Sequence, residues 1–151
     1  MFKRFRRLRI NPVLRDLVQE THLRVDDFIY PLFIKDEIAG YKKEIASMPG
    51  VFQQSIDQAI KECEELKKLG LKAIILFGIP KVKDSVGSDA LCEEGIISRA
   101  IKEIKNAHPD MLIISDLCFC EYTDHGHCGI LDPKMQTVDN DSTLKILAKQ
   151  A

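Results

Sequence analysis

Three cysteines, Cys118, Cys120 and Cys128, form a C-x-C-x7-C pattern shortly after the apolar run 111–115. Thiolates bind zinc, which takes sulfur at about 2.3 Å in a roughly tetrahedral shell. Zinc fingers and ribbons carry paired C-x2-C knuckles, and this pattern has none. Three sulfurs without an obvious fourth leave one coordination position for water or a substrate oxygen, which is typical of a catalytic site. The spacing therefore indicates a zinc centre.

The residues around the cysteines leave other interpretations open. His125 or His127 would close a structural site as a fourth ligand, or the thiols would be redox-active, or simply reduced and unused. Asp116 shares strand parity with Cys118 and Cys120, so its carboxylate is expected to point into the same space. There it either supports or caps neighbouring groups, or it orients a substrate amine or a proton transfer.

The other side chains that could carry chemistry are interpreted as structural or solvated. Glu121 and Asp124 are expected to be solvated loop charges, and Cys63 a small core residue, while the role of Cys92 is left open. No nucleophile elbow, P-loop or G-x-G-x-x-G pattern occurs, so hydrolase and nucleotide-binding functions lack support. The histidines outside the cluster are expected at the surface: His22 and His108.

The composition of the chain is that of a soluble globular protein, with 45% hydrophobic and 30% charged residues. Its formal net charge of -1 argues against a general nucleic-acid binder. No apolar run approaches the ~18 residues of a membrane span, and none follows the first arginines as a secretory signal requires. We therefore expect a cytoplasmic protein without membrane or nucleic-acid partners, whose cysteines are thiols or metal ligands.

The start of the chain is strongly basic and contains no acid before Asp16. This stretch is read as a solvated arm, an RNA-binding or membrane tail, a targeting peptide, or an arm that docks on a partner subunit. Asn11 and Pro12 then match an N-cap and a first helical position, which predicts a short helix to about Thr21 within an arm over 1–25. The basic residues are Lys3, Arg4, Arg6, Arg7 and Arg9.

Three apolar segments predict buried strands at 28–34, 73–79 and 111–119. Helical periodicity follows each strand in turn, and residues 36–54, with a turn signal at Pro49 and Gly50, are expected to form a loop. The predicted helices run from Ser55, a cap, to Gly70, a terminating glycine; over 90–106; and from Asp139 or Asn140 to the end.

Apolar strands alternating with helices predict an α/β fold with parallel strands under helical cover. In such folds, chemistry gathers in the loops at the carboxyl ends of strands, which is where the cysteine pattern lies. Three βα units cannot close an eight-stranded barrel, which needs about 250 residues, and the chain stops inside a predicted helix. We therefore expect residues 26–151 to be the incomplete N-terminal part of a βα barrel.

The segment 116–129, supported by 27–34, 47–52 and 77–84, resembles the 5-aminolevulinate dehydratase (porphobilinogen synthase) family in its zinc-dependent form. The first of these segments looks like the metal-binding segment of that family. The resemblance implies a TIM (β/α)8 barrel and a lyase of the hydro-lyase type. Such an enzyme condenses two molecules of 5-aminolevulinate into porphobilinogen, an early step of tetrapyrrole and haem synthesis.

The resemblance also implies roles for particular residues. Cys118, Cys120 and Cys128 match the ligands of a catalytic Zn2+, whose open position polarises the keto oxygen of the second substrate. Asp116 matches an aspartate beside that substrate, and His127 matches a position linked to a second metal in some members. An additional allosteric Mg2+ is an option for the full-length enzyme. The basic start resembles an arm that embraces a neighbouring subunit in a homo-octamer.

One departure from the family pattern limits what the chain is expected to do. The family forms Schiff bases through two lysines on later strands, in segments that do not occur here, and its active-site lid is also missing. We therefore expect an N-terminal portion that makes no porphobilinogen alone. The alternative is a small zinc-binding interaction module with a closed Cys3His site and a basic arm. Lysines that do not match the family contexts include Lys81, Lys83, Lys134 and Lys145.

Overall fold

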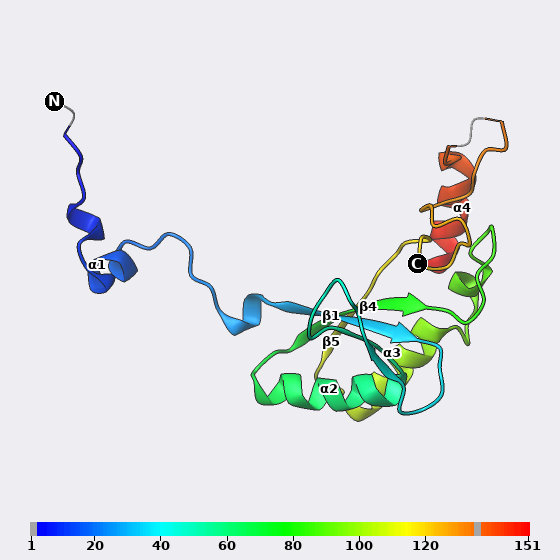
Figure 1. The fold of residues 1–151 in the computed structure, drawn as a ribbon, viewed down its shortest axis with the longest axis horizontal. Coiled ribbons are helices and arrows are strands. Elements are labelled where there is room, and N and C mark those ends of the chain that lie inside the picture. Colours follow the sequence, from blue (N-terminus) through cyan, green and yellow to red (C-terminus); the bar gives the residue numbers. More distant parts are fainter. Residues whose placement is uncertain (1–2, 135–136) are drawn as a thin grey trace.

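The chain builds a five-stranded sheet in the order β2-β3-β1-β4-β5, with the helices of residues 56–68 and 96–107 on one face and a long N-terminal arm (Figure 1). The computed structural model describes residues 3–134 and 137–151. The strands are β1 (Ile29–Lys35), β2 (Lys42–Glu44), β3 (Phe52–Gln54), β4 (Ala73–Ile79) and β5 (Leu112–Ser115). The helices are α1 (Pro12–Leu17), α2 (Ile56–Lys68), α3 (Ile96–Ala107) and α4 (Asn140–Gln150).

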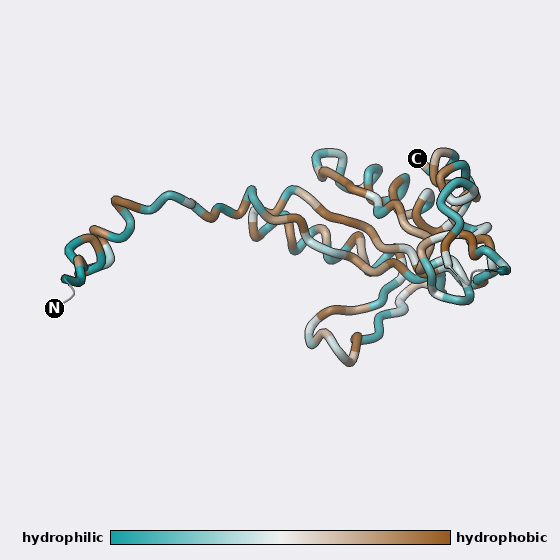
Figure 2. Tube along the Cα trace, turned by 90° about the horizontal axis from the view of Figure 1, so that it is seen from above, coloured by the Kyte–Doolittle hydropathy of each residue, from teal (hydrophilic) through white to brown (hydrophobic). Residues whose placement is uncertain are grey.

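The core lies between the sheet and the helices α2 and α3. Alternate residues of the strands point to this side, among them Leu32 and Ile34 of β1 and Ile74 and Leu76 of β4, all buried. They pack on apolar faces of the two helices, which lie side by side under the sheet (Figure 1). Figure 2 shows hydrophobic residues gathered along the central strands. The helical residues in this core are Ala59, Cys63, Leu66, Ile96, Ala100 and Ile104.

The predicted parallel arrangement is confirmed for the long strands. β1 pairs in parallel with β4 along its whole length, from Ile29 opposite Ala73 to Lys35 opposite Ile79. β4 pairs in parallel with β5, so the carboxyl ends of β1, β4 and β5 meet at one edge. On the face away from the helices, the rings of Phe33 and Phe77 stack with their centroids 5.2 Å apart.

The loop predicted over 36–54 is wrong, because it contains two short strands. β2 and β3 form an antiparallel hairpin, and β3 adds in parallel to β1 with Phe33 opposite Gln53. Each strand has only three residues, too few for a period of two to be read from the sequence. Pairing with β1 creates them, and Gly50, with φ of 81°, makes the turn between them.

Several predicted boundaries also move. The second helix begins at Ile96 instead of near residue 90, because residues 88–91 form a 3₁₀ turn and Gly95 occupies the N-cap. The third strand ends at Ser115 instead of Phe119, and α1 ends at Leu17 instead of Thr21. The predicted caps Asn11 and Asp139 are confirmed, since their side chains accept from the backbone N–H groups of Leu14 and Ser142. Gly70 is confirmed as the left-handed residue after α2.

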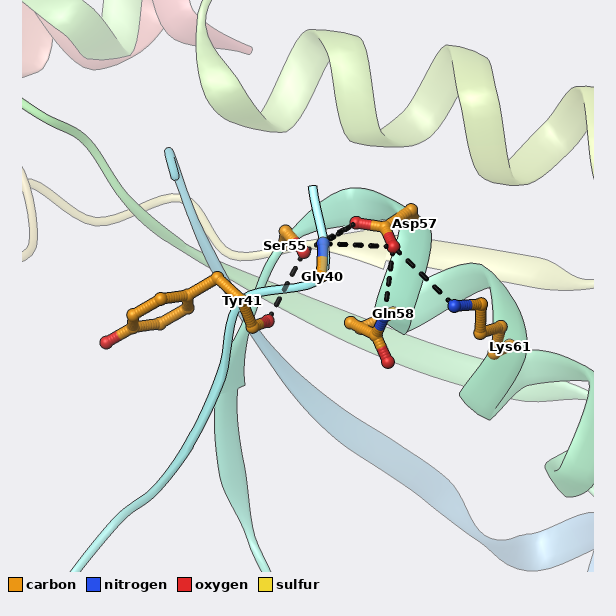
Figure 3. A network of polar contacts seen from close by, with 6 residues as sticks. All are labelled: Gly40, Tyr41, Ser55, Asp57, Gln58 and Lys61. Atoms are coloured by element: carbon orange, nitrogen blue, oxygen red, sulfur yellow. Dashed lines mark hydrogen bonds and ion pairs between the residues drawn. The ribbon is translucent and has the colours of Figure 1, made fainter. Parts of the chain in front are cut away.

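Ser55 is the N-cap of α2 as predicted, but its hydroxyl makes no capping hydrogen bond and bonds to other groups (Figure 3). It donates to Asp57 Oδ1 at 2.6 Å and contacts the carbonyl oxygen of Tyr41 at 3.2 Å. The Asp57 carboxylate also accepts from the backbone N–H of Gly40 and from Gln58, and it pairs with Lys61. These bonds, the one from Ser55 foremost, lower the pKa of Asp57 to about 2. Asp57 thus fastens the loop after β1 to the start of α2.

Two single-residue expectations have opposite outcomes. Cys63 is confirmed as a core residue, fully buried, and burial raises the pKa of its thiol to about 11. His108, expected at the surface, is buried at the end of α3, and its Nε2 lies 3.0 Å from the carbonyl oxygen of Ile60 on α2. The histidine therefore joins the two helices, a contact between residues far apart in the sequence.

The N-terminal arm projects from the body as an irregular chain that carries α1 (Figure 1). Its apolar side chains have no cover: Phe5 is 90% exposed and Val13 76%. They alternate with hydrophilic residues along the arm (Figure 2). No helix within the described ranges is both long enough and apolar enough to cross a membrane.

Candidate metal centre

The three cysteine sulfurs converge in the loop after β5, at the carboxyl edge of the sheet. The sulfur of Cys118 lies 3.3 Å from that of Cys120 and 3.3 Å from that of Cys128. All three sulfurs lie within 4.8 Å of one another, and all five cysteines of the chain are free thiols. Strand parity does not explain this arrangement, because β5 has already ended at Ser115.

A tight turn brings Cys118 and Cys120 together in place of a strand. The carbonyl oxygen of Phe119, the residue between them, accepts from the backbone N–H groups of Tyr122 and Thr123, each at 2.9 Å. The side chains of Phe119, Tyr122 and Thr123 are buried, with 1%, 4% and 2% exposed. Burial of two aromatic rings fixes the turn to the body of the protein.

A single hydroxyl helps to return the chain to the cluster. Thr123 Oγ1 donates to the carbonyl oxygen of His127 at 3.0 Å, directly before Cys128. The turn that contains Cys120 is thereby tied to the residue preceding the third thiol. Gly126 has a positive φ of 73°, which lets the chain reverse sharply between Thr123 and Cys128.

The donor set suits a thiophilic divalent cation. Three sulfurs at 2.3 Å from a tetrahedral zinc ion would lie about 3.8 Å from one another, slightly wider than the 3.3 Å found here. Small outward movements of the side chains would accommodate such an ion. Zinc accepts three thiolates readily and has no demand for a particular fourth ligand.

Two of the three thiols have a raised pKa. Burial and the neighbouring thiol of Cys118 raise the pKa of Cys120 to about 12, and the contact with Cys118 also raises the pKa of Cys128. Crowding three ionisable sulfurs disfavours charge on more than one of them. A bound cation would reverse this, so loading the site releases protons.

Two carboxylates border the sulfurs. Ligand atoms of Asp116, Cys118 and Glu121 all lie within 4.8 Å of one another. The interpretation of Glu121 as a solvated charge is wrong: it is half-buried, and burial together with nearby Asp116 raises its pKa. Asp124 is exposed, as expected. The sequence carries no signal for Glu121, because the turn at Phe119 decides which way the side chain faces.

The two histidines of the segment stand apart from the sulfurs. His125 Nδ1 accepts from the backbone N–H of His127 at 3.1 Å, and its Nε2 lies 3.2 Å from the carbonyl oxygen of Ser85. Both ring nitrogens are therefore engaged, with the proton assigned to Nε2. His127 is exposed, and in the described part of the chain no imidazole nitrogen joins the three sulfurs. This geometry gives no support to a closed Cys3His site.

A cavity of about 200 Å³ lies beside Asp116 and is lined by α3 residues and by the end of α4. Two of its lining residues, Asp89 and Gln150, each have a buried side-chain oxygen without a hydrogen-bond partner among the described residues. Cys92, whose role the sequence left open, is exposed and also lines the cavity. The cavity offers acceptors to a donor-bearing group close to the sulfur cluster.

The fold and the site together define a class of protein. A mainly parallel sheet with helices packed on one face, and with potential metal ligands gathered at its carboxyl edge, is part of a βα barrel, a fold in which catalytic groups lie in the loops at that edge. The family model of delta-aminolevulinic acid dehydratase matches residues 2–151. The chain belongs to the delta-aminolevulinic acid dehydratase family.

Individual relatives agree with this assignment. The delta-aminolevulinic acid dehydratase of Helicobacter pylori is 57% identical over 150 residues, which cover 99% of this chain and 46% of the relative. That of Halalkalibacterium halodurans is 48% identical, with 99% and 45% covered. The crystal structure of the Toxoplasma gondii ME49 enzyme in complex with porphobilinogen superposes with a TM-score of 0.90 at 35% identity, covering 99% of this chain and 43% of that one. The chain spans under half the length of these relatives.

Proposed function

We propose that this chain supplies the metal centre of a porphobilinogen synthase, a lyase that condenses two molecules of 5-aminolevulinate into porphobilinogen for tetrapyrrole and haem synthesis. The observation that carries the proposal is the convergence of three thiols at the carboxyl edge of the sheet in a member of this family. The likeness to an enzyme crystallised with porphobilinogen supports the same substrate class.

The proposed ligands of a zinc ion are Cys118, Cys120 and Cys128. When bound, zinc supplies Lewis acidity that polarises a carbonyl oxygen. The carboxylate of Asp116 lies within 4.8 Å of the Cys118 sulfur, and we propose that it accepts a hydrogen bond from the ammonium group of a substrate and orients it. Glu121 adds negative charge on the same side. The reducing cytoplasm is the compartment in which these thiols stay available.

His127 has a separate place in the proposal. It is exposed and lies next to His125, with ring centroids 5.5 Å apart. We assign it as a ligand to a second metal in the assembled enzyme. An allosteric Mg2+ receives no residue from the described part of this chain.

Turnover needs more than this centre. The Schiff-base lysines implied by the family have no counterpart in the chain, and β5 is paired with β4 on one side only. The sheet is therefore open, and further βα units are required to surround a substrate. We expect no porphobilinogen from the purified 151-residue chain supplied with 5-aminolevulinate and zinc. Product formation above a protein-free blank would contradict this part of the proposal.

The arm is proposed to pack on a neighbouring subunit in a homo-octamer. Its exposed apolar residues, Phe5 and Val13 among them, need cover that the body of this chain does not provide. Deleting residues 1–25 is expected to lower the number of subunits per particle, obtained as the molar mass from light scattering divided by the mass of the shortened chain. An unchanged number of subunits would remove the arm from the assembly interface.

Cobalt titration tests the metal centre itself. The reduced chain is expected to bind one Co2+ with intense thiolate-to-metal absorption, and the spectrum is expected to respond to an added small ligand at the open position. Four protein ligands without an exchangeable water would favour the interaction module. Failure of the reduced, metal-replete chain to bind any ion would remove the chemical basis of the proposed function.

A further inference from the structure

The loop between β4 and the 3₁₀ turn at residues 88–91 lies against the cysteine segment, although no role in the metal centre has been assigned to it. The backbone N–H of Asp84 donates to the carbonyl oxygen of Tyr122 at 3.3 Å, and the N–H of Asp124 donates to the carbonyl oxygen of Asp84 at 3.1 Å. Together these bonds form a short parallel bridge between Asp84 and Thr123. The bridge lies on the turn that follows Cys120.

The side chain of Asp84 shapes its own loop and is not directed at a metal. Its Oδ1 accepts from the backbone N–H groups of Val86 and Ser88, each at 3.0 Å. The Ser88 side chain and these backbone donors hold the pKa of Asp84 below its usual value. The carboxylate thus supplies an acceptor for the backbone N–H groups of Val86 and Ser88.

Residues 84–88 pack closely against Phe119, the residue between Cys118 and Cys120. Gly87 has φ of +63°, and a Cβ placed there would lie 2.8 Å from Cδ1 of Phe119. Phe119 is 1% exposed, so it cannot retreat without disturbing its surroundings. The carbonyl oxygen of Ser85 adds a third contact, to Nε2 of His125. Residues 84–87 therefore contact the cysteine segment at Phe119, at Tyr122–Asp124 and at His125.

We propose that Asp84 is a positioning residue for the metal centre: by folding residues 84–88 against the 119–125 turn, it gathers the three thiols before an ion arrives. This inference rests on the proposed function, because it presupposes that the thiols bind a metal. The physical reason is that a flexible segment must be ordered when three ligands close on one ion. A loop ordered in advance avoids that cost, and groups behind the ligands typically change metal affinity 10–100-fold.

The test is a competition titration with Co2+ and Zn2+ on reduced samples of the 151-residue chain. Asp84→Ala removes both acceptor contacts and is expected to weaken binding about tenfold or more, with altered thiolate-to-cobalt absorption. Asp84→Asn keeps an oxygen at the same position and is expected to restore affinity to within about threefold of the wild type. Ser55→Ala serves as the matched control, since it removes a buried hydroxyl at the N-cap of α2 that bonds to Tyr41 and Asp57 and not to the cysteine segment. It is expected to leave affinity unchanged.

Gly87→Ala gives a second, independent variant in case Asp84→Ala does not fold without metal, as judged by circular dichroism. Its added Cβ displaces Phe119, so weaker binding and a changed cobalt spectrum are expected. Wild-type affinity in whichever of these two variants folds would overturn the positioning role. Equal losses in Asp84→Ala and Ser55→Ala would also overturn it, because they would reveal a general effect of stability. If the wild-type chain itself binds no metal, the proposed metal centre fails first, and that outcome is distinct from the others.

Discussion

Two loops at the carboxyl edge of the sheet are each held by an aspartate carboxylate that accepts from backbone N–H groups, but the two loops have different surroundings. After β1, the carboxylate of Asp57 accepts from the backbone N–H of Gly40 and fastens the loop to α2 (Figure 3). After β4, the carboxylate of Asp84 accepts from the N–H groups of Val86 and Ser88. Only the second loop lies against a cluster of thiols. Each of these two partly exposed aspartates fastens its own loop, and the segment that packs against that loop decides whether the aspartate also matters for chemistry.

Removal of a proposed ligand should produce the largest loss of zinc affinity. It would distinguish the role of the thiol cluster from that of the other residues at the carboxyl edge. Cys120→Ser is expected to weaken zinc binding about 1,000-fold, or about 4 kcal/mol, because one thiolate contributes roughly a quarter to a third of a tight zinc site. Chelator competition measures it. Cys92→Ser, at an exposed thiol outside the cluster, is the matched control and should bind as the wild type does. Similar losses in both variants would contradict the ligand assignment.

A substitution in the core between the sheet and the helices should lower the stability of the fold without changing its affinity for metal. Leu76→Ala empties a fully buried position between β4 and the helices and is expected to cost about 3 kcal/mol in the free energy of unfolding. Urea denaturation of the metal-free chain measures this loss. Zinc affinity of the folded fraction should stay within about twofold of the wild type, because the site lies beyond the strand ends. A large loss of zinc affinity would mean that packing in the core also determines the geometry of the metal centre.

The stabilising contribution of Asp57 should depend on pH. Its pKa is depressed to about 2 in the folded chain from an ordinary value near 3.8, so its stabilising contribution is present above pH 4 and fades as pH falls toward 2. Because the side chain is 37% exposed, solvent screening reduces the contribution to about 1 kcal/mol. Asp57→Asn should therefore destabilise the chain at pH 6 and match the wild type near pH 2, as measured by denaturation at each pH. A difference independent of pH would contradict the charge-based account.

The smallest effect is expected from the carboxylate beside the sulfurs. Glu121→Gln removes a half-buried negative charge close to Cys118 and should weaken zinc binding about threefold, or about 0.7 kcal/mol. Asp124→Asn, at an exposed position of the same segment, should change affinity less. Equal effects would show that only the net charge of the segment matters.

Local sequence patterns were sufficient for the long elements. The strand predicted at 73–79 coincides with β4, and the caps at Asn11 and Asp139 hold the bonds that their side chains predict. Such features depend on residues a few positions apart, so periodicity and turn chemistry reveal them. The boundary near residue 90 was wrong because residues 88–91 form a 3₁₀ turn and Gly95 caps α3. The boundary after Ser115 was wrong because the chain leaves the sheet there and turns at Phe119.

The sequence by itself determined the family, the apolar strands, and the presence of three thiols close together in the chain, because residue identity and spacing are local properties. Only the tertiary structure decided that β2 and β3 are strands, that His108 is buried, and that Glu121 faces the sulfurs. The contact between residues 84–88 and the turn at Phe119 belongs to the same group. Each of these depends on segments that folding brings together, and no spacing along the chain encodes such a meeting.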